Sequence, residues 1–429
     1  MPKFIGKLLK HQEEGVDFAL SSPYHINGFE MGLGKTATSL AVAVKLKAKT
    51  LVVAPAYLKK NWLEEIEKFT TGLDITIISY HDLNKWAEFD IEQIKNKKTG
   101  KIKKSKKLRG LIKDIPYYDL VVVDEAHYLK SHTPLRSMIF HNLMQKMRPG
   151  HMMLMSGTPI KNRVSEFWSL LQLCYHGGSY PEFKPFHRLY YKFCNRFSYE
   201  RTFEVNRVPI VRFDGVRRVP ELKELISKVY IRRRASEVLD LPDDIHIDIM
   251  NKASKKYEDD LKKAYELFKI DADDPVYMSL KAANALSKVE DTYKFAKDML
   301  EQDKKAIIFT CHKDAARDLA KRLSVKYIDG SVAPDTRHDI INDFNNSRSG
   351  VLVATIGSAS TGFNITSANY MIFNDFPFVP ADLDQAIRRM LRIGQLKKCF
   401  FYYMFNSEFD KKLFDMINRK KKDIGRVYE

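Results

Sequence analysis

Long apolar runs and paired cysteines are both missing from this sequence of 429 residues. No stretch approaches the roughly 18 apolar residues that a membrane-spanning helix needs, and the first residues lack the apolar core of a secretory signal. The cysteines are few and form no C-x-x-C pair, namely Cys174, Cys194, Cys311 and Cys399. This spacing argues against a zinc site and against a disulfide framework. We therefore expect reduced thiols and a location in the cytoplasm of a prokaryotic or phage-infected cell, or in the nucleus of a eukaryote.

Acidic residues are too few to balance the basic ones, and the formal net charge is +18. Such an excess indicates a polyanionic partner. Half of it lies in residues 95–109, where nine of fifteen residues are Lys or Arg and none is acidic. A run this dense repels itself, so we expect a mobile loop. The loop is either merely solvated or in contact with a nucleic-acid backbone, and we prefer contact because it releases condensed counterions.

Short apolar, β-branched runs alternate with helical patterns in both halves of the chain, which indicates parallel sheets. The expected strands of the first half are 51–54, 75–78, 120–123 and 152–155. Those of the second half are 306–309, 325–328, 351–354, 370–373 and 400–404. The fold class is therefore α/β, with two sheet domains in tandem, and polar motifs follow several strands where open α/β sheets bind ligands.

The segment Glu30-Met31-Gly32-Leu33-Gly34-Lys35-Thr36 has the composition of a nucleotide phosphate loop. Gly32 and Gly34 let backbone amides approach phosphate oxygens closely. Lys35 would reach the β- and γ-phosphates, and the Thr36 hydroxyl would ligate Mg²⁺. The strict G-x-x-x-x-G-K-T pattern fails, because Phe29 stands at the first glycine position.

A second nucleotide motif, Asp124-Glu125-Ala126-His127, follows the expected strand 120–123. Asp124 can hold Mg²⁺, directly or through water, and Glu125 can polarise the attacking water. His127 is then placed to sense the γ-phosphate. Together with the phosphate loop, this motif predicts ATP and Mg²⁺ as substrate and cofactor.

Arginines in the second half complete the expected constellation. Gln385, Arg389 and Arg392 are spaced i, i+4 and i+7, so on one helix they would share a face. Guanidinium groups suit phosphate recognition, and an arginine finger stabilises charge on the transferring γ-phosphate. We expect these arginines to serve the same ATP as Lys35.

These motifs resemble those of superfamily 2 motors of the SWI/SNF-type ATPase family, from residue 9 to residue 395. The matching segments are Lys10-His11-Gln12, 29–36, Val53-Ala54-Pro55 with Asn61-Trp62 and Glu65, 124–127, Ser156-Gly157-Thr158-Pro159, Ile231-Arg232-Arg233 with Leu241-Pro242, Asp329-Gly330-Ser331, 360–364 and Arg392-Ile393-Gly394-Gln395. Phe29 replaces the family's first aspartate, Arg388 a common glycine and Leu391 a common histidine. Neither of the last two departures removes a charged catalytic group.

The resemblance implies two tandem RecA-like lobes with helical insertions. We expect lobe 1 at 1–230, with the basic loop at 95–109 and an insertion at about 164–230. A linker at 231–247 would lead to lobe 2 at 248–429, with an insertion at about 252–300. The short chain implies a minimal motor, similar to annealing or branch-migration helicases.

The resemblance also assigns further site residues. Gln12 would read adenine, and Leu33, Gly362 and Gln385 would join the nucleotide site. By resemblance, the expected DNA contacts are Lys59, Ser79, Thr310 and Thr355. The charge of the basic loop adds Lys103, Lys104, Lys106 and Lys107. Protein partners are not indicated.

Several functions remain open. The leading prediction is an ATP-dependent translocase that remodels forked or branched DNA. A strand-separating helicase is the nearest rival, and a motor subunit of a restriction or repair complex is a third reading. A non-hydrolysing DNA-binding protein on a motor fold belongs to a different class, and the intact catalytic residues weigh against it.

Overall fold

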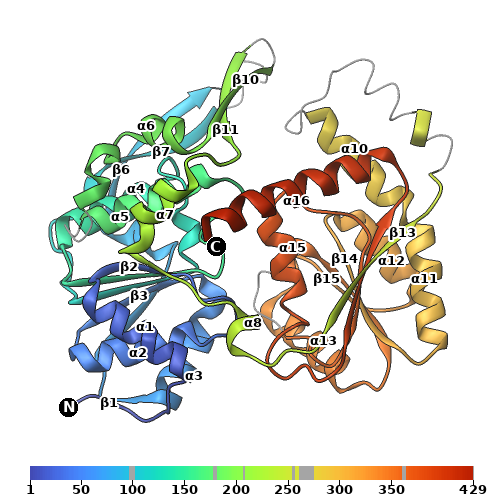
Figure 1. Cartoon of the computed structure of the whole chain (residues 1–429), viewed down its shortest axis with the longest axis horizontal. Helices are drawn as coiled ribbons and strands as arrows, with labels where there is room; N and C mark the ends of the chain where they lie inside the picture. The colour runs from blue at the N-terminus through green and yellow to red at the C-terminus, as the bar shows by residue number, and fades with distance from the viewer. Residues whose placement is uncertain are drawn as a thin grey trace. The chain divides into compact units, whose positions relative to one another are not determined.

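The computed structural model consists of two units, each built on its own parallel sheet (Figure 1). It describes residues 1–95, 102–176, 181–205, 208–253, 257–259, 275–359 and 364–428. The first unit comprises residues 1–201, 212–238 and 424–429, and the second comprises residues 202–211 and 239–423. The end of the chain therefore belongs to the first unit.

The first unit has a six-stranded sheet in the order β12-β2-β9-β8-β3-β5, with all neighbours parallel. Its strands are β2 (Tyr24–Asn27), β3 (Thr50–Ala54), β5 (Ile75–Ser79), β8 (Leu120–Asp124), β9 (His151–Met155) and β12 (Tyr230–Ile231). Successive side chains point to opposite faces, so Leu51 and Val53 enter one core while Val52 and Ala54 enter the other. Both faces are buried, which explains the continuous apolar runs.

Helices cover both faces of this sheet (Figure 1). One face is covered by α1 (Lys10–Ser21), α2 (Lys35–Leu46) and α3 (Lys59–Phe69), and the other by α4 (Leu135–Met147) and α5 (Phe167–His176). The unit also contains β1 (Lys3–Phe4), β4 (Thr70–Thr71), α6 (Tyr190–Phe197), α7 (Val219–Ser227) and α8 (Ala235–Val238). Short 3₁₀ turns are η1 (Ala56–Leu58), η2 (Asp82–Trp86), η3 (Ala126–Leu129), η4 (Val164–Glu166) and η5 (Pro181–Phe186).

The second unit has a six-stranded sheet in the order β13-β18-β17-β14-β16-β15, again with all neighbours parallel. Its strands are β13 (Asp244–Met250), β14 (Lys305–Thr310), β15 (Tyr327–Ile328), β16 (Gly350–Thr355), β17 (Tyr370–Phe373) and β18 (Cys399–Phe405). Its helices are α10 (Pro275–Ser287), α11 (Val289–Glu301), α12 (Lys313–Leu323), α13 (Pro334–Asn346), α14 (Ile356–Ala359), α15 (Pro380–Ile387) and α16 (Glu408–Tyr428). Side chains of α11 and α12 pack on one face, and those of α13, α15 and α16 pack on the other.

The predicted α/β class and the predicted tandem sheets are confirmed, and each expected strand is present within a few residues. Two sequence expectations are wrong. The basic segment is not a loop over residues 102–109, because these belong to β7 (Ile102–Leu111), which pairs antiparallel with β6 (Ala87–Lys95), while residues 96–101 lie outside the described residues. The predicted insertion at 164–230 is not purely helical, because it contains the hairpin of β10 (Tyr199–Val205) and β11 (Val208–Asp214).

The segment predicted as a linker, 231–247, also carries regular structure. It contains α8 and the start of β13, which pairs with β18 over seven residues. Ile245, Ile247 and Ile249 alternate with more polar neighbours, a strand signal that sequence reasoning missed. Of the insertion predicted at 252–300, residues 254–256 and 260–274 lie outside the described residues. Among the described helices, none is both long and apolar enough to cross a membrane.

Candidate nucleotide and DNA site

The phosphate-loop segment connects β2 to α2, as expected for a loop that presents a helix N-terminus to an anion. Gly32 and Gly34 have φ of 85° and 73°, in the left-handed region that favours glycine. Gly34 caps α2 without any side-chain cap hydrogen bond. The first turn of α2 is therefore not capped by a protein side chain, which is the arrangement that phosphate groups use.

Lys35 lies at the start of α2 and bends back over the loop. Its Nζ donates to the carbonyl oxygens of Phe29 (2.9 Å) and Glu30 (3.2 Å). Position 29 thus serves the site through its backbone carbonyl, so the side chain there is free to differ. Phe29 is fully buried and its ring contacts the ring of His11, with centroids 5.6 Å apart. The departure from the family pattern is accommodated as core packing.

Two side chains of α1 bind the middle of the loop. Gln12 Nε2 donates to the Leu33 carbonyl oxygen at 3.2 Å, and His11 Nε2 lies 3.0 Å from the same oxygen. A Cβ on Gly34 would lie 2.1 Å from Gln12 Nε2, so this approach requires glycine there. Gln12 Oε1 also accepts the Leu9 amide at 2.9 Å. Gln12 therefore couples helix α1 to the phosphate loop, and its predicted role in reading adenine stays a prediction.

Asp124 ends β8 and is held by two donors. Trp62 Nε1 donates to Oδ2 and the Glu125 amide donates to Oδ1, both at 2.9 Å. Burial, followed by the charge of Glu125, raises the pKa of Asp124 to about 6, while the nearby Lys35 ammonium acts to lower it. The effect of Lys35 shows that the two nucleotide motifs lie close together. A divalent cation would relieve the repulsion between the two carboxylates.

Glu125 has φ 51° and ψ 49°, a left-handed conformation that is uncommon for a residue other than glycine. Such strain is typical of functional positions, where surrounding contacts maintain it. Tyr80 supplies one of these contacts, since its hydroxyl donates to the carbonyl oxygens of Asp124 (2.8 Å) and Glu125 (3.3 Å). Glu125 is thereby held against the end of the sheet.

His127 links Glu125 to the segment after β9. Its Nδ1 lies 3.1 Å from Glu125 Oε2 and 3.2 Å from Ser156 Oγ. Ser156 Oγ in turn accepts the Thr158 amide at 3.2 Å. The structure therefore brings two motifs of the first unit into one polar cluster of Glu125, His127 and Ser156.

The residues of the first unit fit a magnesium–nucleotide complex. In the described part of the chain, no group of three or more His, Cys, Asp or Glu side chains could hold a metal by itself. Mg²⁺ usually binds through one or two carboxylates plus substrate phosphates and water. Asp124 offers such a carboxylate, and Thr36 follows Lys35 in the first turn of α2. Both remain predicted ligands.

A pair of arginines clamps the nucleotide motifs, and sequence reasoning did not assign them this role. Arg232 Nη2 lies 3.1 Å from Glu30 Oε1, and Arg233 Nη2 lies 2.6 Å from Glu14 Oε2 on α1. The Glu30 amide also donates to the Arg233 carbonyl oxygen at 3.1 Å. The segment after β12 therefore fixes both α1 and the entry to the phosphate loop. The acidic partners at positions 14 and 30 were the available signal.

The predicted arginine helix of the second unit is shorter than expected. Gln385 lies on α15 and is buried, but α15 ends at Ile387, so Arg389 and Arg392 follow the helix rather than share a face of it. Gly394 has φ 94° just beyond them, which prevents a regular continuation. Arg389 is buried, and Arg392 Nη1 donates to Asn364 Oδ1. Among the described residues, Nε of Arg392 has no hydrogen-bond partner. Gly362 lies outside the described residues.

Two predicted DNA contacts of the first unit converge on one carboxylate. Asp82 Oδ2 accepts from Lys59 Nζ (3.0 Å), the Ser79 amide (2.8 Å) and Ser79 Oγ (2.7 Å). Lys85 Nζ lies 2.8 Å from Asp82 Oδ1. The hydrogen bonds from Lys85, Ser79 and Lys59 hold the pKa of Asp82 far below its usual range. Asp82 orders this end of β5, although the sequence analysis had not selected it.

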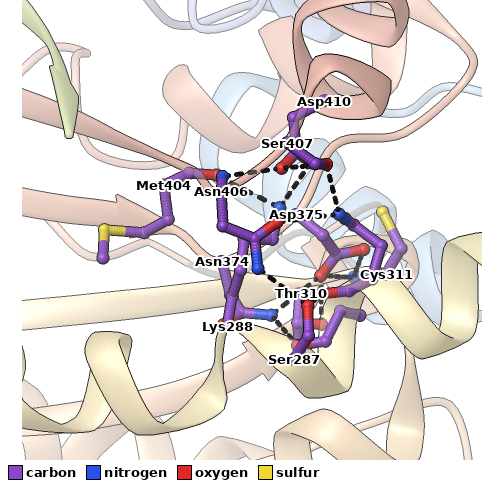
Figure 2. A network of polar contacts seen from close by, with 12 residues as sticks. Ser287, Lys288, Thr310, Cys311, Asn374, Asp375, Met404, Asn406, Ser407 and Asp410 are labelled. Atoms are coloured by element: carbon purple, nitrogen blue, oxygen red, sulfur yellow. Dashed lines mark hydrogen bonds and ion pairs between the residues drawn. The ribbon is translucent and has the colours of Figure 1, made fainter. Parts of the chain in front are cut away.

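The predicted DNA contacts of the second unit differ in their placement. Thr355 ends β16 and is buried. Thr310 is fully buried, and its hydroxyl donates to Asp375 Oδ1 (Figure 2). Thr310 therefore belongs to a buried polar network, and its predicted contact with a DNA backbone stays a prediction.

This strand-end network lies at the carboxyl ends of β14, β17 and β18. Figure 2 labels its members Ser287, Lys288, Thr310, Cys311, Asn374, Asp375, Met404, Asn406, Ser407 and Asp410. Lys288 Nζ and Asp410 Oδ1 form a fully buried ion pair at 2.6 Å. Lys288 Nζ also donates to the Met404 carbonyl oxygen at 3.1 Å, and the Asn406 amide donates to Asp410 Oδ2 at 2.9 Å. The network joins the α10–α11 corner to the strand ends.

The basic segment of the first unit forms one strand of a hairpin whose other strand is acidic. Lys107 Nζ lies 3.3 Å from Glu92 Oε1, and Arg109 Nη2 lies 3.3 Å from Glu88 Oε2. Lys106 pairs instead with Ile91, and its Nζ lies over the Phe89 ring, 5.1 Å from the centroid. Acidic neighbours thus offset part of the basic charge. Lys103 and Lys104 pair with Ile94 and Gln93, and their side chains lie outside the described part.

Comparisons with known proteins agree with these motifs. The model of the SNF2-related domain matches residues 11–306, and that of the helicase conserved C-terminal domain matches residues 287–394. "DNA annealing helicase and endonuclease ZRANB3" of Homo sapiens is 27% identical over 98% of this chain and 40% of its own length. The Bos taurus protein of that name is 26% identical, over 99% of this chain and 41% of its own.

A third relative is "SWI/SNF-related matrix-associated actin-dependent regulator of chromatin subfamily A-like protein 1" of Drosophila melanogaster, which is 25% identical over 99% of this chain and 56% of its own. The chain therefore spans between about two-fifths and three-fifths of the length of these relatives. The solved "Sulfolobus solfataricus SWI2/SNF2 ATPase core in complex with dsDNA" aligns at 20% identity with a TM-score of 0.39. Because the SNF2-related model covers more than half of the sequence and a helicase C-terminal domain follows it, this chain belongs to the SNF2-related family of superfamily 2 helicase-type ATPases.

Proposed function

We propose that this protein is an ATP-dependent DNA translocase that remodels forked or branched DNA. The observation that carries the proposal is the polar cluster of the first unit. There, the charge of Lys35 lowers the pKa of Asp124, and the side chain of His127 contacts those of Glu125 and Ser156. The similarity to relatives named as annealing helicases supports the choice of DNA substrate.

The first unit supplies the groups for ATP hydrolysis. The amides of the phosphate loop and Lys35 would bind the β- and γ-phosphates, with Gln12 keeping the loop against α1. Thr36 and Asp124 would hold Mg²⁺, which supplies charge neutralisation on the phosphates when bound. Glu125 would orient a water molecule and take its proton, and His127 would connect this step to Ser156.

The second unit would contribute Arg389 and Arg392 to the same reaction, with Gln385 beside them. Their guanidinium groups would stabilise charge on the γ-phosphate as the bond to the leaving phosphate breaks. The unpartnered Nε of Arg392, noted above for the described residues, supports a ligand at this position.

The proposed DNA contacts are made to the backbone rather than to bases. Ser79 and Lys59 lie around Asp82, and Thr355 ends β16. The hairpin of β6 and β7 adds basic residues at 103, 104, 106 and 107. Contacts of this kind position a protein on DNA without reading sequence, which suits a motor that must act on many sites.

The decisive experiment compares matched DNA substrates in the presence of ATP and Mg²⁺. A fork with homologous arms and a mobile four-way junction should be converted, while a fork with heterologous arms and an immobile junction should not. A plain partial duplex should stay intact. Lys35→Ala is the control, and it should retain DNA binding without conversion. Unwinding of the partial duplex would favour a strand-separating helicase. ATP hydrolysis without conversion of any substrate would reject the proposal.

A further inference from the structure

The end of helix α16 lies in the core of the first unit, although the helix begins in the second. Ile424 and Val427 are buried in the first unit's hydrophobic core, and residues 424–429 belong to that unit. The next residue, Tyr428, accepts the amide of Ile160 at 2.8 Å through its hydroxyl. Ile160 closely follows Ser156, the contact of His127. The last turn of α16 therefore contacts the chain just after the Ser156-Gly157-Thr158-Pro159 motif.

The Tyr428 ring also packs against the guanidinium group of Arg232. The guanidinium carbon of Arg232 lies 4.1 Å from the centroid of the Tyr428 ring, and the Tyr230 ring centroid lies 5.6 Å from that of Tyr428. On its other side, Arg232 Nη2 contacts Glu30 Oε1 at 3.1 Å. Among the described residues, Nε and Nη1 of Arg232 have no hydrogen-bond partner. The Tyr428 ring and the Glu30 carboxylate are therefore two of the contacts that hold this cation, and Tyr230 is a third.

Glu30 connects Arg232 to the phosphate loop. Its carboxylate accepts the Ala235 amide at 2.9 Å, and its carbonyl oxygen accepts from Lys35 Nζ at 3.2 Å. The Tyr230 ring also packs closely against the backbone of Gly28, just before the phosphate loop. A Cβ on Gly28 would lie 2.4 Å from the ring. A displaced Arg232 would thus remove one contact of the Glu30 carboxylate, in a residue whose carbonyl oxygen also holds Lys35.

We propose that Tyr428 is a positioning residue for nucleotide binding, which acts through Arg232 and Glu30 to preorganise the phosphate loop. The inference rests on the proposed ATP site but not on any DNA substrate. A cation over an aromatic ring in a desolvated place is worth roughly 5- to 30-fold in an equilibrium. Preorganisation of this kind raises the affinity for the ligand, because a loop that is not already ordered must be ordered when the ligand binds.

The first turn of α16 has a polar contact as well. Asp410 there forms the buried pair with Lys288.

The test uses the full chain, a fluorescent ATP analogue and Mg²⁺, without DNA. Tyr428→Ala should weaken analogue binding by roughly 5- to 30-fold, because it removes the ring from Arg232. Tyr428→Phe keeps the ring and should bind within about twofold of wild type. Val427→Ala is the matched control, since it loosens the same helical turn without touching Arg232, and it should bind normally below its melting temperature.

A double-mutant cycle separates positioning from general damage. Arg232→Gln should itself weaken binding, and adding Tyr428→Ala to it should have no further effect, because the affected contact is already gone. Multiplicative effects would overturn the inference. Equal weakening by Tyr428→Phe and Tyr428→Ala would also overturn it, since the hydroxyl contact to Ile160 would then be responsible. Because the assay contains no DNA, failure of the proposed DNA function would leave this result interpretable.

Discussion

Polar side chains gather at the carboxyl ends of the strands in both units, but they are satisfied in opposite ways. In the first unit, Asp124 and Glu125 stand side by side, and the resulting repulsion adds to burial in raising the pKa of Asp124. In the second, the strand-end network pairs Lys288 with Asp410 and surrounds Asp375 with donors from Thr310 and Cys311. Adjacent like charges at a strand end are typical of a binding site for a cationic ligand, whereas a strand end with matched buried charges depends on both partners being present.

Arg392→Ala tests whether the second unit contributes to catalysis, although the polar groups of its strand-end network are paired with one another. An arginine finger is worth roughly 10³ to 10⁵ in turnover. We expect DNA-stimulated ATP hydrolysis to fall by that order, while ATP affinity changes far less because the contact is made mainly in the transition state. Steady-state hydrolysis with and without forked DNA measures both. Full DNA-stimulated activity in this variant would show that Arg392 is not required for catalysis.

Glu125→Gln removes the charge that distinguishes the first strand end. Loss of the group that activates water should lower turnover by roughly 10²- to 10⁴-fold, with ATP and Mg²⁺ binding retained. Single-turnover hydrolysis and binding of a fluorescent ATP analogue separate the two effects. A variant that hydrolyses ATP at the wild-type rate would assign water activation to another residue.

Lys288→Met tests the matched charges of the second strand end. It leaves Asp410 buried without its cation, which should cost about 3–5 kcal/mol in the free energy of unfolding. Urea unfolding checks this, with Lys326→Met as the control, because the Lys326–Asp343 pair at 2.9 Å is exposed. The control should change stability by less than about 1 kcal/mol. Equal effects would mean that the network contributes no special stability.

Asp124→Asn should change stability in a pH-dependent way. The folded pKa of Asp124 is about 6, above the unfolded value, so the nucleotide-free protein holds this proton more tightly when folded. Stability from this group is therefore present at low pH and is lost as pH rises through about 4 to 6. Over this range, the free energy of unfolding of the variant should rise relative to that of wild type, by about 3 kcal/mol at most.

Melting temperatures between pH 4 and 7.5, in EDTA, measure this gain. Asp82→Asn is the control, since hydrogen bonds from Lys85 and Ser79 lower the pKa of Asp82, which is then ionised in folded and unfolded protein over nearly all of this range. The stability difference between Asp82→Asn and wild type should therefore hardly vary with pH here. A difference that does not vary with pH for Asp124→Asn would refute the raised pKa.

The smallest effect is expected in the basic hairpin. If Lys106 contacts a phosphate, Lys106→Ser should reduce the log–log salt slope of duplex binding by about 0.9. Lys107→Ser should reduce it by less, because Lys107 is shared with Glu92. Titrations over a range of salt concentrations compare the two variants. An unchanged slope in both would mean that the hairpin does not bind the DNA backbone.

The sequence was most informative where one residue type serves one local geometry. The apolar runs predicted the parallel strands, because strands buried on both faces need continuous apolar side chains. Gly32, Gly34 and Lys35 predicted the phosphate loop, because left-handed turns and phosphate charge demand those residues. The charge of residues 95–109 misled us about structure, since charge alone does not reveal an acidic partner strand such as β6.

Contacts between distant segments were decided only by the tertiary structure. Trp62 holds Asp124 across 62 positions, Arg232 meets Glu30 across 202, and Tyr428 accepts the Ile160 amide across 268. The sequence alone predicted that the Thr310 hydroxyl contacts DNA, but in the structure this hydroxyl is buried beside Asp375. Motif spacing records which groups are present near a strand end. Whether such a group faces a ligand or a buried partner depends on which other segments the packing brings to it, and no local pattern encodes that choice.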